Sequence, residues 1–244
     1  MSSLYFREDL ESTGVGETIS LRGPEAKHAV SVSRLRVGES TSIGNGRGLI
    51  ASGPVTKSEP GELEIRVDSV VVHPEPRPAM VLVQALAKGD RDELAIQAAT
   101  ELGVDRIVPW SAERSISRWQ GDKASKGRLR WQTIVREASK QSIRARVPEV
   151  ADVVDTKQLT SLVEGRLVLV LEPTAANALS ETVIDDGTTE ILLVVGPEGG
   201  ISPNERDRLA EAGAVAVRLG SGVLRTSTAG PAAISALSVL LRRW

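Results

Sequence analysis

The sequence predicts an α/β fold in which a parallel sheet follows a small β domain. From residue 80 onward, short apolar runs typical of buried strands alternate with helical segments, the pattern of a parallel sheet with helical crossovers. Before residue 73 the runs are separated by Gly, Pro, Asn and Ser clusters, which is typical of a small barrel or sandwich. Prolines 74, 76 and 78 favour a stiff, extended connector. We therefore expect domains at 1–73 and 74–244.

The elements follow from these patterns in chain order. In the first domain we expect strands at 18–21, 42–43, 49–55 and 62–67, and a helical stretch at 24–30. In the second we expect strands at 80–87, 105–110, 166–171, 191–195 and 214–219, and helices at 91–102, 123–143 and 231–241. One more helix is expected after 191–195, because Ser202 is a good N-cap, Pro203 suits the first turn and Glu205 completes a capping box.

The composition narrows the classes of function. The 244 residues include no cysteine, which excludes disulfides, thiolate metal sites and cysteine nucleophiles, and fits a cytoplasmic protein. With only two histidines we expect no metal site, and no Ser-His-Asp arrangement stands out. We also expect no signal peptide and no membrane span. The net charge of −2 means that any signal for nucleic acid must be local.

Three loops follow strands of the predicted sheet and are the strongest candidates for a ligand site. They begin at Glu172, Gly196 and Gly220. Because parallel strands present their carboxyl ends at one edge, we expect these loops to meet there, where open α/β sheets bind ligands. Glycines at strand ends often do no more than form turns, but three such loops at one edge favour a pocket.

Two segments resemble nucleotide-binding motifs, and one further stretch is strongly basic. GPEGGISPNE (196–205) lacks the Gly-Lys-Ser/Thr of a phosphate-binding loop, and GSGVLR (220–225) has Arg225 in place of the third glycine of a dinucleotide fingerprint. A nucleotide-binding oxidoreductase is therefore disfavoured. Residues 106–147 hold eleven basic and three acidic residues, a local surplus of about +8. This surplus suits an RNA backbone, although, taken alone, it is explained slightly better by a solvated helix face with Trp119 and Trp131 packed inward.

Several segments together resemble one known family. They are GPEGGISPNE at 196–205, LGSGVLRTSTAGPAAISAL at 219–237, the helix end QAATELGV at 97–104, the helix from Arg130 to Pro148, and His28 with RLRVGE at 34–39. The chain resembles the RsmE family of 16S ribosomal RNA uridine-N3 methyltransferases, in the SPOUT superfamily. The matches run through essentially the whole chain, in order.

The resemblance implies a detailed picture of the molecule. It implies a PUA-like β-barrel that binds RNA at 1–73, and a SPOUT-type α/β domain at 74–244 whose C-terminal segment forms a trefoil knot. It further implies S-adenosylmethionine as cofactor, a homodimer formed through the knots, and 16S ribosomal RNA of the small subunit as partner. The cofactor-binding residues carried over by motif are Leu171, Glu172, Pro173, Gly196, Pro197, Glu198, Gly199, Gly200, Ile201, Leu219, Gly220, Val223, Leu224, Arg225, Thr226, Ser227 and Ala229.

Residue roles in the reaction are narrower hypotheses. Arg225 is the candidate for stabilising charge on the uridine or holding a phosphate, and Glu198 for contacting the cofactor or acting as a base. A structural role, bonding loop backbone, is the alternative for each. Candidates for RNA contacts are Arg34, Arg36, Lys88, Arg114, Arg136, Arg144 and Arg146.

The chain departs from the family at two positions. Ser227 stands where a glutamate is usual, and Ile143 stands where a glycine is usual. The first change removes a carboxylate near the cofactor loops, and the second alters backbone freedom next to Arg144. Two other functions stay open at this point: methylation of another ribosomal or transfer RNA position, and a non-catalytic RNA-binding module.

Overall fold

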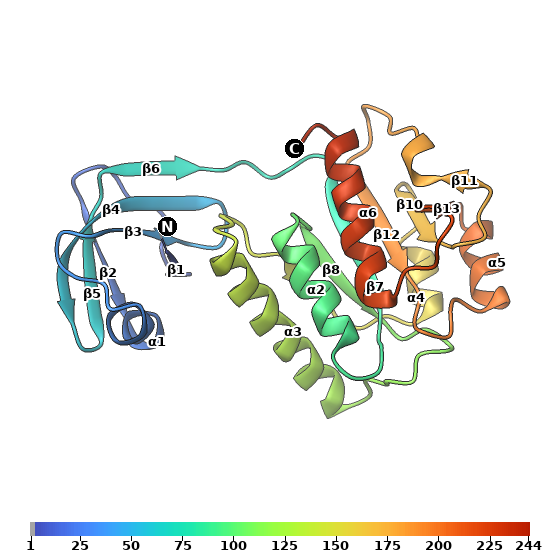
Figure 1. The fold of residues 1–244 in the computed structure, drawn as a ribbon, viewed down its shortest axis with the longest axis horizontal. Helices are drawn as coiled ribbons and strands as arrows, with labels where there is room; N and C mark the ends of the chain where they lie inside the picture. Colours follow the sequence, from blue (N-terminus) through green and yellow to red (C-terminus); the bar gives the residue numbers. More distant parts are fainter. Residues whose placement is uncertain (1–2) are drawn as a thin grey trace. The chain divides into compact units, whose positions relative to one another are not determined.

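The computed structural model describes residues 3–244, which form two compact units (Figure 1). The N-terminal unit contains the chain through Glu75 together with Ser139–Val147. The C-terminal unit contains Pro76–Ala138 and Pro148–Trp244. A nine-residue segment from the middle of the chain therefore packs with the N-terminal strands, which no local pattern in the sequence indicates.

The N-terminal unit is built on a six-stranded sheet. Its strands are β1 (Leu4–Phe6), β2 (Thr18–Arg22), β3 (Ser40–Gly44), β4 (Leu49–Glu59), β5 (Glu62–Arg66) and β6 (Ser69–Val72). The order is β1-β3-β4-β5-β2, with β6 also paired to β4, and only the β1–β3 pair is parallel. Within residues 3–244 no pairing joins the end strands β1 and β2, so the expected closed barrel is not found.

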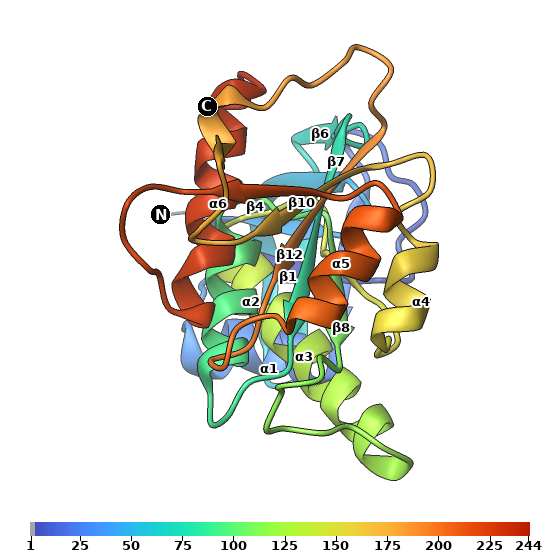
Figure 2. The same cartoon turned by 90° about the vertical axis from the view of Figure 1, so that its right-hand side faces the viewer.

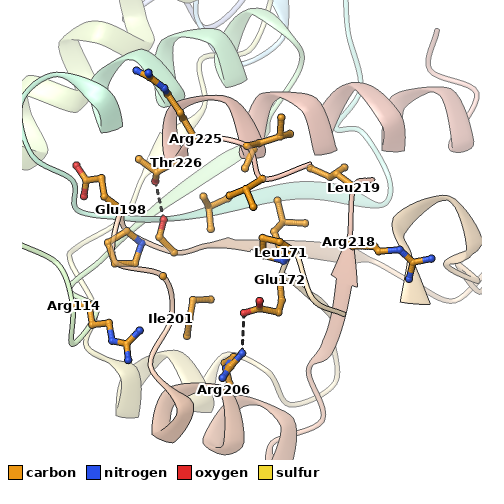
Figure 3. A pocket seen from close by; sticks show the side chains of 18 of the residues that line it. Arg114, Leu171, Glu172, Glu198, Ile201, Arg206, Arg218, Leu219, Arg225 and Thr226 are labelled. Atoms are coloured by element: carbon orange, nitrogen blue, oxygen red, sulfur yellow. Dashed lines mark hydrogen bonds and ion pairs between the residues drawn. The ribbon is translucent and has the colours of Figure 1, made fainter. Parts of the chain in front are cut away.

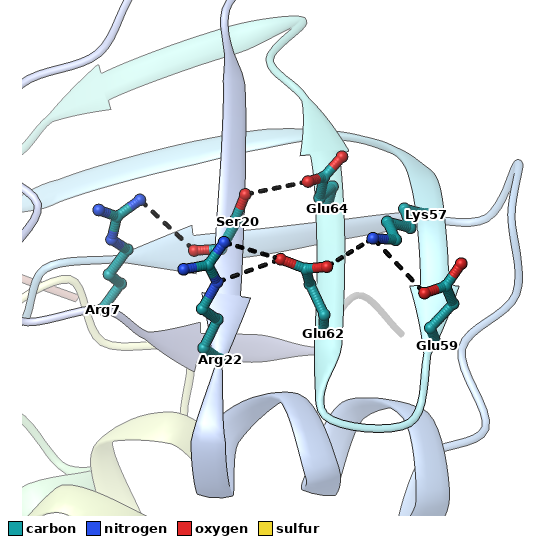
Figure 4. Close-up of polar contacts among 7 residues, drawn as sticks. All are labelled: Arg7, Ser20, Arg22, Lys57, Glu59, Glu62 and Glu64. Carbon is teal, nitrogen blue, oxygen red and sulfur yellow. Dashed lines mark hydrogen bonds and ion pairs between the residues drawn. The ribbon is translucent and has the colours of Figure 1, made fainter.

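One face of this sheet is apolar and another carries paired charges. Helix α1 (Gly23–Lys27) and the π-helical turn η1 (His28–Val32) lie in the unit, and the buried Tyr5, Ile43 and Ile65 belong to its core. On the outside, the Glu62 carboxylate accepts bonds from Lys57 and Arg22 on the flanking strands (Figure 4). The hydrogen bond from Lys57 lowers the pKa of Glu62. These charges compensate one another and leave little net attraction for an anion.

The C-terminal unit contains a seven-stranded parallel sheet, which confirms the predicted fold class. Its strands are β7 (Ala79–Ala85), β8 (Arg106–Trp110), β9 (Glu149–Val150), β10 (Leu167–Leu171), β11 (Asn177–Ala178), β12 (Glu190–Val195) and β13 (Val215–Arg218). The order is β11-β13-β10-β12-β7-β8-β9. The five longer strands were predicted; the two-residue edge strands β9 and β11 were not. Near-continuous apolar runs such as Ile191–Val195 are buried, as a parallel sheet covered on both faces requires.

Helices cover both faces of this sheet (Figure 2). Helices α2 (Arg91–Glu101) and α6 (Thr226–Leu240) pack together on one face, and α4 (Thr156–Ser161) and α5 (Pro203–Glu211) on the other. Helix α3 (Asp122–Gln141) and a 3-10 turn, η2 (Leu179–Glu181), complete the element list. None of the helices within residues 3–244 has the length and apolar character to cross a membrane.

Two helix starts test the capping rules in opposite ways. At α5 the capping box is confirmed, since Ser202 Oγ accepts from the Glu205 amide and the Glu205 carboxylate accepts from the Ser202 amide. At α6 the prediction of a start at Pro231 was wrong. The helix begins at Thr226, because the amides of Thr228 and Ala229 already bond the Arg225 carbonyl and close a first turn. Pro231 lies inside the helix.

Candidate functional site

Three loops at the carboxyl edge of the parallel sheet enclose one cavity of about 620 Å³. They follow β10, β12 and β13, which are neighbours in the sheet. A cavity of this size is in the range that holds a cofactor-sized molecule. All the residues expected at a cofactor line it except Gly199, Gly220 and Ser227. Its wall also contains residues that were not among the cofactor-binding candidates, which are Arg91, Arg114, Val195, Pro203, Arg206, Val217, Arg218 and Gly222.

The loop after β12 has a shape that depends on two glycines for different reasons. A Cβ on Gly196 would lie 2.7 Å from Cγ1 of the buried Ile201 and 3.2 Å from its amide nitrogen. At Gly200 a Cβ would meet nothing within 4 Å, but φ is +72°, a region that favours glycine. The loop therefore folds back tightly on Ile201 at its start and leaves open space beside Gly200.

Glu198 fastens this loop to the chain that follows β7. Its carboxylate accepts the Lys88 amide and the Arg91 guanidinium, both at 2.9 Å. Desolvation acts to raise the pKa of Glu198, but hydrogen bonds from its own backbone, Lys88 and Arg91 outweigh this and lower the pKa. An ionised carboxylate that accepts two hydrogen bonds is a weak base, so this geometry suits a loop anchor better than a proton acceptor.

At another part of the wall, Glu172 and Arg206 form an ion pair, and Arg218 lies apart from them (Figure 3). Arg206, from α5, donates to the Glu172 carboxylate at 3.2 Å. Arg218 donates to the carbonyl of Ala175 at 2.9 Å and also bonds the Ala176 carbonyl. The Glu172 carboxylate thus offers oxygen acceptors beside one fixed cationic group, while Leu171 and Ile201 supply apolar surface.

The loop after β13 leads directly into α6 and carries Arg225. Thr226 donates its hydroxyl to the Gly196 carbonyl at 2.8 Å, which joins this loop to the one after β12. Arg225 is exposed, and its guanidinium has no hydrogen bond to any of residues 3–244. Figure 3 shows its side chain extending away from the Glu172–Arg206 end of the cavity. A cationic group is thus available at the cavity's edge.

The residues expected to contact RNA lie in both units and differ in how they are used. Arg34, Arg36, Arg144 and Arg146 belong to the N-terminal unit, and Lys88, Arg114 and Arg136 to the C-terminal unit. Arg34 and Arg36 are exposed. Arg146 bonds the carbonyls of His73 and Pro74, and Arg114 bonds the Gly199 carbonyl at 2.9 Å. These last two side chains hold backbone in place.

Distant acids and carbonyls partly compensate the basic stretch at 106–147. Arg106 pairs with Glu190, Arg128 with Asp152 and Arg130 with Glu93. Trp131 is buried and Trp119 packs edge-on against it at 5.0 Å, as the alternative of inward-packed tryptophans expects. The surplus counted along the sequence therefore overstates the charge available to a partner.

Comparison with known proteins identifies the family. Residues 73–238 match the RNA methyltransferase domain family. Over its whole length the chain is 42% identical to ribosomal RNA small subunit methyltransferase E of Mycobacterium bovis, covering 94% of that protein. The chain belongs to the ribosomal RNA small subunit methyltransferase E family. The Bacillus subtilis member is 34% identical, across 91% of this chain and 90% of the relative.

A solved structure of this family resembles the whole chain. It is ribosomal RNA small subunit methyltransferase E from Neisseria gonorrhoeae, bound to S-adenosylmethionine. The TM-score is 0.85 at 30% identity, with 98% of each chain covered. Membership confirms the resemblance stated from the motifs, and it identifies the chain as an enzyme of the methyltransferase class. The alternative of a nucleotide-binding oxidoreductase is thereby removed.

Proposed function

We propose that this chain transfers a methyl group from S-adenosylmethionine to N3 of a specific uridine in 16S ribosomal RNA of the small subunit, in the cytoplasm. The observation that supports this most is the single cavity built from three carboxyl-edge loops in a member of a ribosomal RNA methyltransferase family. The N. gonorrhoeae relative binds S-adenosylmethionine, and this chain has the same fold over 98% of its length.

The cavity suits S-adenosylmethionine in size and chemistry. Gly200 and Gly222 border open space, because a Cβ added at either residue would meet no atom within 4 Å. A side chain at these positions would occupy part of that space. Backbone groups of the loops after β10, β12 and β13 would hold the adenosine, and Leu171 and Ile201 would supply apolar contact. When bound, the cofactor supplies an electrophilic methyl group on a sulfonium sulfur. Within residues 3–244 no cluster of His, Asp and Glu is suited to a metal ion.

The protein's part in the reaction is positioning and charge stabilisation. As the N3–carbon bond forms, the carbon–sulfur bond breaks, its electron pair goes to sulfur, and the N3 proton passes to water. Arg225, whose guanidinium has no hydrogen bond to any described residue, stabilises negative charge that develops on the uracil oxygens. Glu198 keeps the loop after β12 in place. With these roles the site lowers the barrier mainly by orientation and by a preorganised cation.

A substitution of Arg225 tests the catalytic assignment. Arg225→Ala should lower kcat by roughly 100- to 1000-fold, as removal of one preorganised charge-stabilising donor does, while the affinity for S-adenosylmethionine changes little. Arg208→Ala, which removes an exposed guanidinium from α5, is the matched control. Unchanged turnover of Arg225→Ala on undermodified small subunits would reject the assignment.

Mapping the methylated nucleotide tests the reaction itself. Small subunits from a strain that lacks the enzyme are incubated with the chain and methyl-labelled S-adenosylmethionine, and modified positions in 16S RNA are located by mass spectrometry. The proposal expects one labelled N3-methyluridine. Label on another base, or on transfer RNA, would replace the assigned substrate and leave the methyltransferase class intact.

The finer architecture belongs to the same proposal. We infer that the N-terminal unit is a PUA-like RNA-binding module, and that the chain after β13 forms a trefoil knot through which two copies pair. Exposed apolar side chains near α6 support pairing, among them Val223, Val239 and Trp244 at 80%, 62% and 64% exposure. Sedimentation equilibrium should report a dimer that Val239→Asp weakens, and a crystallographic trace through the loops tests the knot.

A further inference from the structure

A single amide side chain, that of Gln84, lies near the carboxyl end of the apolar strand β7. Gln84 is fully buried, with Val83 before it and Ala85 after it in the strand. It is paired with Val195 on β12 and Pro109 on β8. Burying an amide is unfavourable unless its polar atoms are bonded, so its bonds in the sheet interior require an explanation.

The bonds of Gln84 fix the direction of a short hydrogen-bond chain. Its Nε2 donates to the Ala85 carbonyl at 3.1 Å and to the Thr226 hydroxyl oxygen at 2.9 Å. Thr226 in turn donates its proton to the Gly196 carbonyl at 2.8 Å. Because a carbonyl only accepts, the amino side of Gln84 must face Ala85, and the Thr226 hydroxyl must receive from Gln84 and give to Gly196.

These hydrogen bonds connect two of the three cavity loops, the one after β12 and the one after β13, from the side away from the cavity. Gly196 starts the loop after β12 and Thr226 starts α6, and both line the cavity, whereas Gln84 is not part of the cavity wall. The Oε1 of Gln84 is buried with no hydrogen-bond partner among residues 3–244. The Nε2 of Gln84 is hydrogen-bonded and its Oε1 is not, so burial of this amide is unfavourable unless Nε2 has a specific role. Here that role is to orient Thr226.

We propose that Gln84 is a positioning residue, which acts through Thr226 to hold the two cofactor loops at the spacing that S-adenosylmethionine requires. The inference rests on the proposed cofactor site. Its consequence is that a side chain outside the cavity controls cofactor affinity. A purely structural role, satisfying the Ala85 carbonyl, would change stability and leave affinity unaltered.

Calorimetric titration of the full chain with S-adenosylmethionine tests this proposal. Gln84→Met keeps the length and removes both donors, and should weaken binding about tenfold, the effect of losing one well-placed hydrogen bond. Thr226→Val should weaken it by a similar factor. The variant with both substitutions should bind S-adenosylmethionine about as tightly as the weaker-binding single variant, because both changes break the same hydrogen-bonded link. Thr226→Ser should restore most of the affinity.

Val83→Ala separates positioning from stability. Val83 lies in the same strand, and it belongs to the core cluster that includes Leu159 of α4 and Leu209 of α5, away from the polar chain. It should lower the melting temperature and leave cofactor affinity within about twofold. The proposal is overturned if Gln84→Met binds as tightly as the unaltered chain, or if Val83→Ala loses as much affinity at equal stability. If Gln84→Met does not fold, equal binding by Thr226→Val and Thr226→Ser overturns it. Failure of the unaltered chain to bind at all would instead reject the cofactor assignment.

Discussion

Ile143 occupies a backbone position that normally belongs to glycine. It follows the C-cap of α3 with φ +55°, its amide donates to the Lys140 carbonyl, and the Arg144 amide donates to the Ser139 carbonyl. This pair of bonds is the Schellman motif, whose left-handed residue is usually Gly. The same pattern closes α2 with Gly103 in the equivalent place. The backbone at 143 is therefore glycine-like, and the side chain there is β-branched.

Comparing two substitutions isolates the backbone effect. Ile143→Ala and Ile143→Gly both remove the exposed side chain, but alanine keeps a Cβ in the left-handed region, which costs about 1–2 kcal/mol. Glycine avoids that cost, but its greater freedom in the unfolded chain lowers the free energy of unfolding by roughly 0.5–1 kcal/mol. We therefore expect Ile143→Gly to be more stable than Ile143→Ala by about 0.5–1 kcal/mol in the free energy of unfolding.

A control within the same helix should show the opposite sign. Lys126 is exposed inside α3, where glycine is less stable than alanine by about 1 kcal/mol. Urea denaturation followed by circular dichroism measures all four variants. If Ile143→Ala is as stable as Ile143→Gly, or if the two sites order alanine and glycine alike, the assignment of strain to position 143 is refuted.

Three further outcomes are expected. Gly196→Ala should weaken S-adenosylmethionine binding by roughly 5- to 150-fold in calorimetry, because the new Cβ overpacks Ile201 at a cost of about 1–3 kcal/mol; Ile201→Ala in the same chain should recover part of the loss. The contribution of Glu198 to stability should be complete above pH 4.5, its ordinary pKa, and should be lost as the pH falls through its lower folded-state pKa. Glu198→Gln should therefore flatten that part of the curve of unfolding free energy against pH. An unaltered curve would contradict the anchor role. Neutralising Arg34 and Arg36 together should reduce the slope of log affinity for small subunits against log salt by about 1–2, whereas an unchanged slope would remove them from the RNA surface.

The parts of the fold that the sequence predicts are those governed by local rules. The apolar run at 191–195 and the Ser202–Glu205 capping box depend on neighbouring residues only, and both are confirmed. That three loops meet follows from the direction of parallel strands, so the cavity could be anticipated before any distance was known. The family resemblance added the cofactor and the target, which no periodicity could supply.

The parts that the sequence does not predict depend on partners far along the chain. Arg130 counts as a free positive charge in the sequence, yet it pairs with Glu93 on another helix. The open edge of the N-terminal sheet depends on which strands pair, and alternation within a strand carries no such information. Gln84 gave one local signal, a lone amide in an apolar run, but its partner Thr226 lies 142 residues away.

In the site, hydrogen bonds between residues far apart in the sequence hold the loop after β12 in place. The loop after β12 is held at Glu198 by Lys88 and Arg91, and at Gly196 by Thr226. Just beyond the loop, Glu205 is buried and accepts the Glu113 amide and the Thr156 hydroxyl.

Charged and polar side chains thus fix the loops, and several of them, such as Glu198 and Arg91, also line the cavity beside backbone groups and small residues. Such a site has little freedom to reorganise, because each loop is fastened to an element packed in the core. Affinity for the cofactor should then depend as strongly on the fastening residues as on the wall. A search for determinants of activity that considers only cavity-lining side chains would miss Gln84, which bonds the cavity-lining Thr226. It would also miss Glu205, which accepts the amide of Ser202, the neighbour of the cavity-lining Ile201.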